Sequence, residues 1–198
     1  LAPLRRHPGT AFFFEALRSP MDRESSDFAR VAGKQDGLAV PTLNVGGWYD
    51  VFLQGTLENY VAMRRAQAPA KLVIGPWSHQ SQGQRVGELS FGYASQAAFI
   101  DLREDFGSLQ LRWFDHWLRA TDTGMLEEPP VKLFVMGANL WRDEADWPLA
   151  RAVITPFYLR ARGALSAEPP ASEPPDRFRY DPADPVPTRG GALLMTPE

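Results

Sequence analysis

Two short apolar segments, each ending in glycine and followed by a tryptophan, constrain the fold of this chain more than any other feature. The first covers residues 38–45 and ends at Gly46-Gly47, and the second covers residues 71–74 and ends at Gly75-Pro76. Short apolar runs that stop at glycine or proline are typical of buried strands that enter tight turns. Between them, an apolar stripe at helical spacing predicts a helix, formed by Leu53, Leu57, Tyr60 and Val61. The order strand, helix, strand predicts a βαβ unit and therefore an α/β fold.

A second amphipathic helix is predicted over residues 95–120. Its apolar residues recur at spacings of three and four, the helical period: Phe99, Leu102, Phe106, Leu109, Trp113 and Trp117. We expect this stripe to pack against the sheet of the βαβ unit.

The pattern changes beyond Thr121, where strand-like runs separated by proline-rich segments replace the helical periodicity. These runs cover residues 131–136, 155–159, 178–180 and 192–195. Several short strands without helical pattern are typical of a sandwich or jelly roll, which needs about eight strands. We therefore expect an all-β domain that is incomplete in this chain.

Composition narrows the classes of partner. Lys and Arg number 21 against 24 Asp and Glu, a formal charge of −3 at pH 7, so no cationic excess favours nucleic acid. No apolar run approaches the roughly 20 residues that a membrane helix needs. The absence of Cys excludes disulfides and Cys-ligated metals. We expect no nucleic acid, membrane, metal or cofactor among the partners, a cytoplasmic rather than secreted location, and a chain able to form a homo-oligomer.

Two polar residues stand directly after the predicted strands, where ligands and catalytic groups gather in open α/β sheets. Asp50 follows the first strand and His79 follows the second. An acid and then a base, separated by one crossover helix, form the later half of an α/β-hydrolase triad. The alternative for Asp50 is an N-cap of the following helix. For the other two histidines, His7 and His116, we favour a surface loop residue and a helix-flank residue.

A nucleophile that would complete such a triad is missing from the sequence. The Gly-x-Ser-x-Gly elbow of these enzymes is matched neither around Ser78 nor around Ser95. In hydrolase order the serine precedes the aspartate, so we expect it, with the oxyanion donors, upstream of Leu1. The chain begins without Met and stops directly after an apolar run, and we therefore expect it to be the C-terminal part of a longer protein.

Several motifs along the chain together point to a known family. They are the segments 45–50, 72–79, 85–92, 134–137, 141–149 and 180–191. These motifs resemble the CocE/NonD family of serine hydrolases, and more distantly α-amino acid ester hydrolases and X-Pro dipeptidyl-peptidases. The resemblance implies the end of a helical cap segment at 1–34, the C-terminal portion of an α/β-hydrolase core at 35–127, and the start of a jelly-roll domain at 128–198.

The resemblance also implies roles for individual residues. Asp50 and His79 match the acid and base of a Ser-Asp-His triad, and Phe52 matches an aromatic that lines the acyl pocket. Leu194 and Met195 match an apolar pair at the pocket edge, where Met195 replaces an expected aromatic. The family implies no cofactor, and its substrates are small molecules with an ester or amide bond.

Two functions of different classes remain open from the sequence. The chain is either part of an esterase or acyl hydrolase whose serine lies outside it, and inactive alone, or a non-catalytic binding or scaffold module with a jelly-roll surface. The presence of both Asp50 and His79 favours the first of these functions, the esterase or acyl hydrolase.

Overall fold

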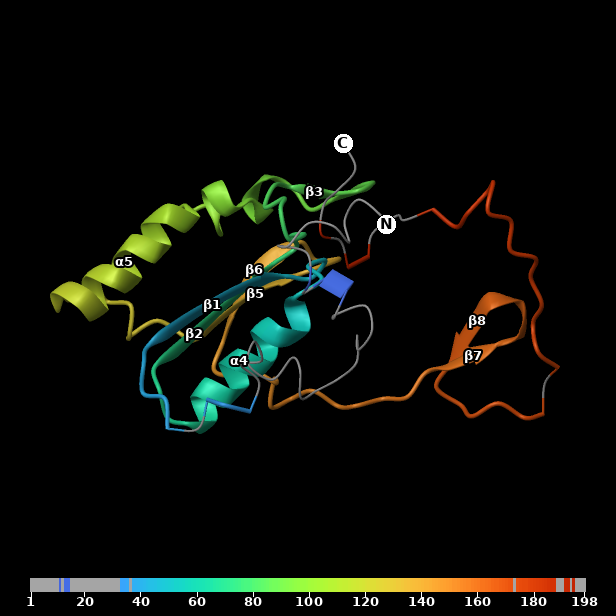
Figure 1. The fold of residues 1–198 in the computed structure, drawn as a ribbon, viewed down its shortest axis with the longest axis horizontal. Coiled ribbons are helices and arrows are strands. Elements are labelled where there is room, and N and C mark those ends of the chain that lie inside the picture. The colour runs from blue at the N-terminus through green and yellow to red at the C-terminus, as the bar shows by residue number, and fades with distance from the viewer. Residues whose placement is uncertain are drawn as a thin grey trace.

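Four strands form one mixed sheet that organises most of the chain. The computed structural model describes Ala11, Phe13, Phe14 and residues 33–35, 37–172, 174–187, 191, 192 and 194. The strands are β1 (Thr42–Gly47), β2 (Ala70–Gly75), β5 (Val131–Val135) and β6 (Leu140–Glu144), in the order β1-β2-β5-β6 (Figure 1). β1, β2 and β5 run parallel, and β6 pairs antiparallel with β5.

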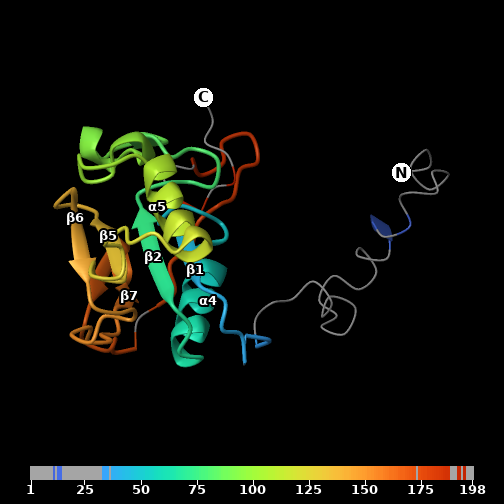
Figure 2. The same ribbon diagram turned by 90° about the vertical axis from the view of Figure 1, so that its left-hand side faces the viewer.

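Two helices cover opposite faces of this sheet, α4 (Leu53–Arg65) below and α5 (Phe106–Arg119) above the strands in Figure 1, and Figure 2 shows the same arrangement from the side. Because successive side chains of a strand point to opposite faces, β2 contributes side chains to two separate hydrophobic cores. Leu72 and Ile74 pack with α4, whereas Val73 packs with α5. All six β2 residues are buried, as expected for a strand covered on both sides.

The βαβ unit predicted from the sequence is confirmed in type and order. β1 begins after Pro41 and reaches Gly47, slightly later at both ends than the predicted segment, and α4 follows it. The pairing of β1 with β2 runs in step from Thr42 opposite Ala70 to Gly47 opposite Gly75. Both strands therefore end at the same edge of the sheet.

The second helix is shorter than predicted. Residues 93–95 and 97–99 form two short 3₁₀ turns, η3 (Tyr93–Ser95) and η4 (Ala97–Phe99), and α5 begins only at Phe106. Asp101 and Leu102 have positive φ, which no helix tolerates, and the Asp105 carboxylate then caps α5 by accepting from Ser108 N.

The apolar stripe of this helix is accordingly only partly buried. Leu109 and Trp113 of α5 pack in the same core as Val73, as predicted, but Phe99 and Leu102 are exposed.

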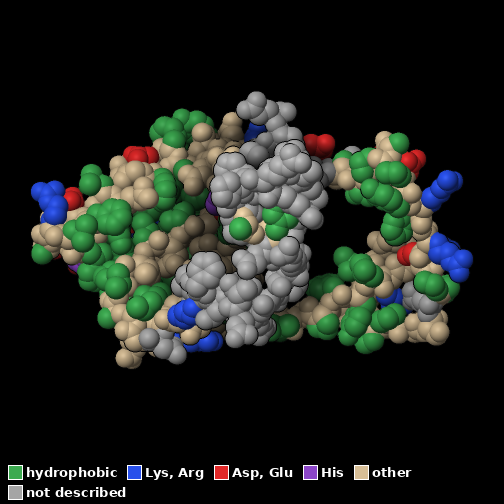
Figure 3. All heavy atoms as spheres, viewed as in Figure 1, with side chains coloured by type: hydrophobic (Ala, Val, Ile, Leu, Met, Phe, Trp, Pro, Cys, Tyr) green, Lys and Arg blue, Asp and Glu red, His purple; other side chains and the backbone are tan. Residues whose placement is uncertain are grey.

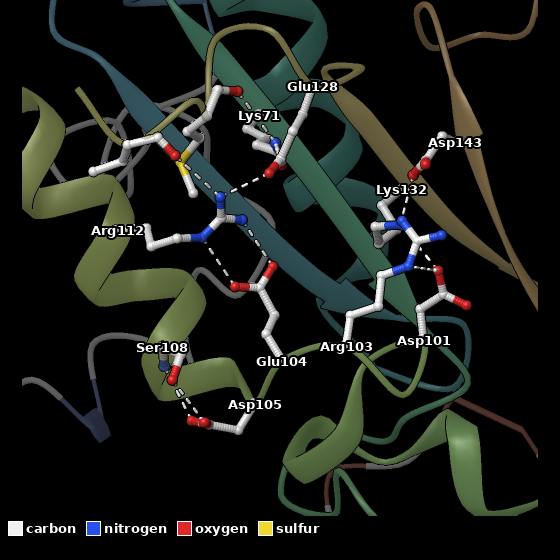
Figure 4. A network of polar contacts seen from close by, with 12 residues as sticks. Lys71, Asp101, Arg103, Glu104, Asp105, Ser108, Arg112, Glu128, Lys132 and Asp143 are labelled. Atoms are coloured by element: carbon white, nitrogen blue, oxygen red, sulfur yellow. Dashed lines mark hydrogen bonds and ion pairs between the residues drawn. The ribbon is translucent and has the colours of Figure 1, made fainter.

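A polar network also fastens α5 to the sheet (Figure 4). Arg112 of α5 binds Glu104 through two nitrogens at 3.0 and 2.8 Å and binds Glu128 at 2.7 Å. Glu128 in turn lies 2.5 Å from the ammonium of Lys71 in β2, whose side chain is 5% exposed. Burial opposes the charged form of Glu128, but its hydrogen bonds from Arg112 and Lys71 outweigh this and lower its pKa.

The segment 131–136 was predicted as a strand of a separate all-β domain. It does form a strand, but its assignment to that domain is wrong. β5 pairs in parallel with β2, with Val131 opposite Leu72 and Leu133 opposite Ile74. A continuous apolar run identifies a buried strand but not its partner, and here the partner is the βαβ sheet.

The remaining strands of the all-β region are few in the part of the chain that the structure describes. β7 (Tyr158–Arg160) and β8 (Ala164–Ser166) form a hairpin joined by η5 (Ala161–Gly163) and set apart from the sheet in Figure 1. The predicted strand at 178–180 is absent: these residues have no regular structure and are exposed. The prediction at 192–195 lies partly, and that of short helices in 1–34 mostly, outside the described residues. A further small hairpin joins β3 (Arg85–Val86) and β4 (Leu89–Ser90).

Candidate active site

The loops that follow β1 and β2 leave the sheet side by side and are joined by main-chain hydrogen bonds. Trp48 N donates to Gly75 O at 2.9 Å, and Tyr49 N donates to Trp77 O at 3.0 Å. These bonds continue the pairing of the two strands beyond their ends. They fix the spacing between the loop that carries Asp50 and the loop that carries His79.

Two glycines leave room for Trp77 at this point. A Cβ on Gly47 would overlap the carbonyl of Trp77, and a Cβ on Gly75 would overlap the indole ring of Trp77. A side chain at Gly47 would therefore push the two loops apart, whereas one at Gly75 would displace the Trp77 indole within the His79 loop. Both glycines are required by packing against Trp77, in addition to turn geometry.

Asp50 and His79 meet across these loops. His79 Nδ1 lies 3.1 Å from Asp50 Oδ2. The other carboxylate oxygen, Oδ1, accepts a hydrogen bond of 2.8 Å from Phe52 N. The predicted proximity of Asp50 and His79 is therefore confirmed. The alternative that Asp50 caps α4 is wrong, because the N-cap residue of α4 is Phe52 and no side chain caps that helix.

The His79 imidazole is partly exposed to solvent, and its orientation is restrained by Asp50 and Phe52. The Asp50 side chain is 12% exposed and the His79 side chain 41% exposed. The Phe52 ring packs edge to face on the imidazole, with ring centroids 4.8 Å apart. With Nδ1 turned to the carboxylate, Nε2 is the ring nitrogen that remains for a substrate or nucleophile, and it has no hydrogen-bond partner within the described parts of the chain.

The backbone around His79 is folded into a closed turn. Ser78 N donates to Ser81 O at 3.1 Å, and Ser81 N donates to the buried Ser78 hydroxyl at 3.2 Å. These bonds restrain the residues on both sides of the imidazole. Their sequence signal, serines flanking the histidine, was present but was not interpreted as a turn.

The resemblance also implies an apolar pair at the pocket edge. Leu194 is exposed, and Met195 lies outside the described residues. A hollow of about 500 Å³ lies elsewhere, along α4 beside Trp147, and neither Asp50 nor His79 lines it. The candidate site is therefore defined by the Asp50–His79 pair.

Apolar side chains gather over α5 in the face shown in Figure 3. Leu111, Phe114 and Leu118 of this helix are exposed. His116 is half-buried beside Trp117, as expected of a helix-flank residue, and His7 lies outside the described residues.

In the described part of the chain, no three His, Cys, Asp or Glu side chains converge as metal ligands would. None of the helices described there has the length and apolar character needed to cross a membrane.

Comparison with known proteins matches both halves of the chain. Residues 3–81 match the family described as X-Pro dipeptidyl-peptidase (S15 family), and residues 123–197 match the X-Pro dipeptidyl-peptidase C-terminal non-catalytic domain. Cocaine esterase of Rhodococcus sp. (strain MB1 Bresler) is 39% identical over 190 residues, which cover 91% of this chain and 32% of that protein. This chain thus spans about a third of the length of that relative.

Two solved structures share the fold. An aminopeptidase from the marine sediment archaeon Thaumarchaeota archaeon superposes with a TM-score of 0.58 at 26% identity, over 88% of this chain and 31% of its own. An α-amino acid ester hydrolase superposes with a TM-score of 0.53 at 30% identity, over 75% of this chain and 25% of its own. The fold is therefore of the class found in these α/β hydrolases. Within that class, the chain belongs to the CocE/NonD family.

Proposed function

We propose that this chain supplies the acid and the base of a Ser-Asp-His triad in a serine hydrolase whose nucleophile lies outside these 198 residues. The observation that carries the proposal is the 3.1 Å contact between His79 Nδ1 and Asp50 Oδ2 at the ends of neighbouring parallel strands. The similarity to an esterase, an aminopeptidase and an ester hydrolase supports it.

In the proposed reaction, His79 Nε2 takes the proton of the serine hydroxyl while the serine oxygen attacks the acyl carbon. The imidazolium then gives this proton to the leaving alcohol or amine, and an acyl-enzyme remains. Water, deprotonated by the same nitrogen, hydrolyses the acyl-enzyme and frees the serine. The Asp50 carboxylate holds the proton on Nδ1, and the hydrogen bond from Phe52 N fixes the orientation of this carboxylate.

The proposed substrates are small molecules with a carboxylic ester or amide bond. Phe52 is proposed to line the acyl pocket, because its ring already contacts the imidazole that would stand beside the acyl group. Leu194 and Met195 are proposed at the pocket edge. The cap segment at 1–34 and a jelly-roll start in the part of 128–198 that follows β6 complete the proposed architecture. The 41% exposure of His79 leaves room for further protein to cover the site.

The test is ester hydrolysis by a longer protein that contains this chain together with its nucleophile, with p-nitrophenyl acetate as substrate. His79→Ala should lower kcat by several orders of magnitude with little effect on the melting temperature, because an exposed loop imidazole contributes little to the core. His116→Ala, at the helix flank, is the matched control and should keep wild-type activity. Equal rates in His79→Ala and wild type would contradict the proposal and favour a non-catalytic binding module.

A further inference from the structure

Two buried indoles hold one turn beside the histidine loop. Trp77 lies two residues before His79 and is 1% exposed, and its Nε1 donates to Ser95 O at 2.7 Å. Trp141 of β6 is 7% exposed, and its Nε1 donates to Ala94 O, also at 2.7 Å. The two indoles pack on each other with ring centroids 5.7 Å apart. They therefore bind consecutive carbonyls of η3 as a pair.

The segment around η3 is also hydrogen-bonded to the loop that leads away from His79. Ala97 N donates to Gln82 O at 2.9 Å, and Phe91 N donates to Gln84 O at 2.9 Å. The Ser95 hydroxyl closes the turn internally on Gly92 O at 2.7 Å. The histidine loop is thus held before His79 by Trp77 and after His79 by the segment that both indoles fix.

The same tryptophan also holds the aspartate loop, because Tyr49 N binds the Trp77 carbonyl at 3.0 Å. One residue therefore connects the loop of Asp50, the loop of His79 and η3. Each of these contacts is a hydrogen bond inside or at the edge of the core, where its geometry is strongly restrained.

We propose that the indole pair of Trp77 and Trp141 positions His79 against Asp50. Trp141 lies within residues 123–197, which match a domain described as non-catalytic, so this region would contribute a positioning residue to the Asp50–His79 pair. The catalytic meaning of this role rests on the proposed function, but the positioning itself is measurable on the chain alone.

The test reads the tautomer of His79 by long-range ¹H–¹⁵N NMR of the ¹⁵N-labelled chain, with His7→Gln and His116→Gln used for assignment. In the wild type we expect the Nδ1–H tautomer, because Nδ1 faces the carboxylate. Trp141→Phe should convert this pattern to a mixture with the Nε2–H tautomer. Replacing Trp141 with 3-benzothienylalanine, which keeps the bicyclic ring and removes only the N–H donor, should give the same direction of change if Phe disturbs folding.

Trp113→Phe is the matched control, because Trp113 is 5% exposed in the same core but does not bind η3. It should leave the His79 spectrum unchanged. A wild-type tautomer in both Trp141 variants, or an equal change in Trp113→Phe, would overturn the proposal. If Asp50→Asn leaves the wild-type spectrum unaltered, the Asp50–His79 pair itself fails and the proposed function fails with it, which is a different result.

Discussion

Gly47, in the loop of Asp50, lies directly against the main-chain carbonyl of Trp77, in the loop of His79. Since no side chain fits between them, Gly47→Ala should force the loops apart and destabilise the chain by about 1–3 kcal/mol, the usual cost of overpacking. The measurement is urea unfolding of the 198-residue chain.

Gly55 provides the opposite expectation in the neighbouring helix. It lies in α4 with nothing within 4 Å of its Cβ position, so Gly55→Ala should stabilise the chain by about 0.5–1 kcal/mol. Gly47→Ala and Gly55→Ala, which add the same methyl group, should thus change the free energy of unfolding in opposite directions. Stabilisation by both would show that the loops are not in contact at Gly47.

The Lys71–Glu128 pair should respond asymmetrically to truncation. Glu128→Ala leaves the ammonium of Lys71, 5% exposed, with only Met125 O at 3.5 Å, and should cost about 2 kcal/mol or more. Lys71→Met should cost less, because Glu128 keeps Arg112. The double variant Lys71→Met with Glu128→Ala should be more stable than Glu128→Ala alone. Unfolding free energies of the three variants check this, and a double variant less stable than both single variants would contradict it.

Glu144 of β6 should make stability depend on acid pH. Its hydrogen bonds from Arg151, and next those from Arg142, lower its pKa from 4.5 to about 2 although burial opposes this. Because the folded-state pKa lies below the unfolded value, the stabilisation is complete above about pH 4.5 and is lost as the pH falls towards 2. Glu144→Gln should therefore lose stability at pH 7 and flatten the decline of unfolding free energy between pH 5 and roughly 2. Glu127→Gln, at an exposed position with no ion pair among the described residues, should follow the wild-type curve.

Asp50→Asn should impair catalysis less than His79→Ala in the longer protein. The amide keeps the imidazole in place but favours the wrong tautomer, whereas alanine removes the base itself. The measurement is kcat for p-nitrophenyl acetate at neutral pH. A more severe loss in Asp50→Asn than in His79→Ala would contradict the assignment of His79 as the base.

The sequence allowed the Asp50–His79 pair to be predicted because parallel strands in step end at one edge, whatever the rest of the fold does. It did not allow the place of β5 to be predicted, since an apolar run is equally compatible with any buried sheet. The start of α5 was missed for a different reason. The apolar period continues through Phe99 and Leu102, although positive φ at Leu102 interrupts the helix there.

The indole contacts of Trp77 and Trp141 could not have been predicted from spacing. Each joins a side chain to a main-chain carbonyl far along the sequence, and any residue type can supply such a carbonyl. Gly47 was recognised as a turn residue, but the neighbour that excludes a Cβ there, the Trp77 carbonyl, belongs to the opposite loop.

The two edges of the sheet differ in whether they can grow. β6 carries Arg142, Asp143 and Glu144 in succession, and charged side chains on an edge strand discourage the addition of another strand. β1 has no charged residue, and no strand among the described residues pairs with its outer side. A further strand would therefore add beside β1. If it ran parallel to β1, its C-terminal end would lie at the same edge of the sheet as the loops of Asp50 and His79.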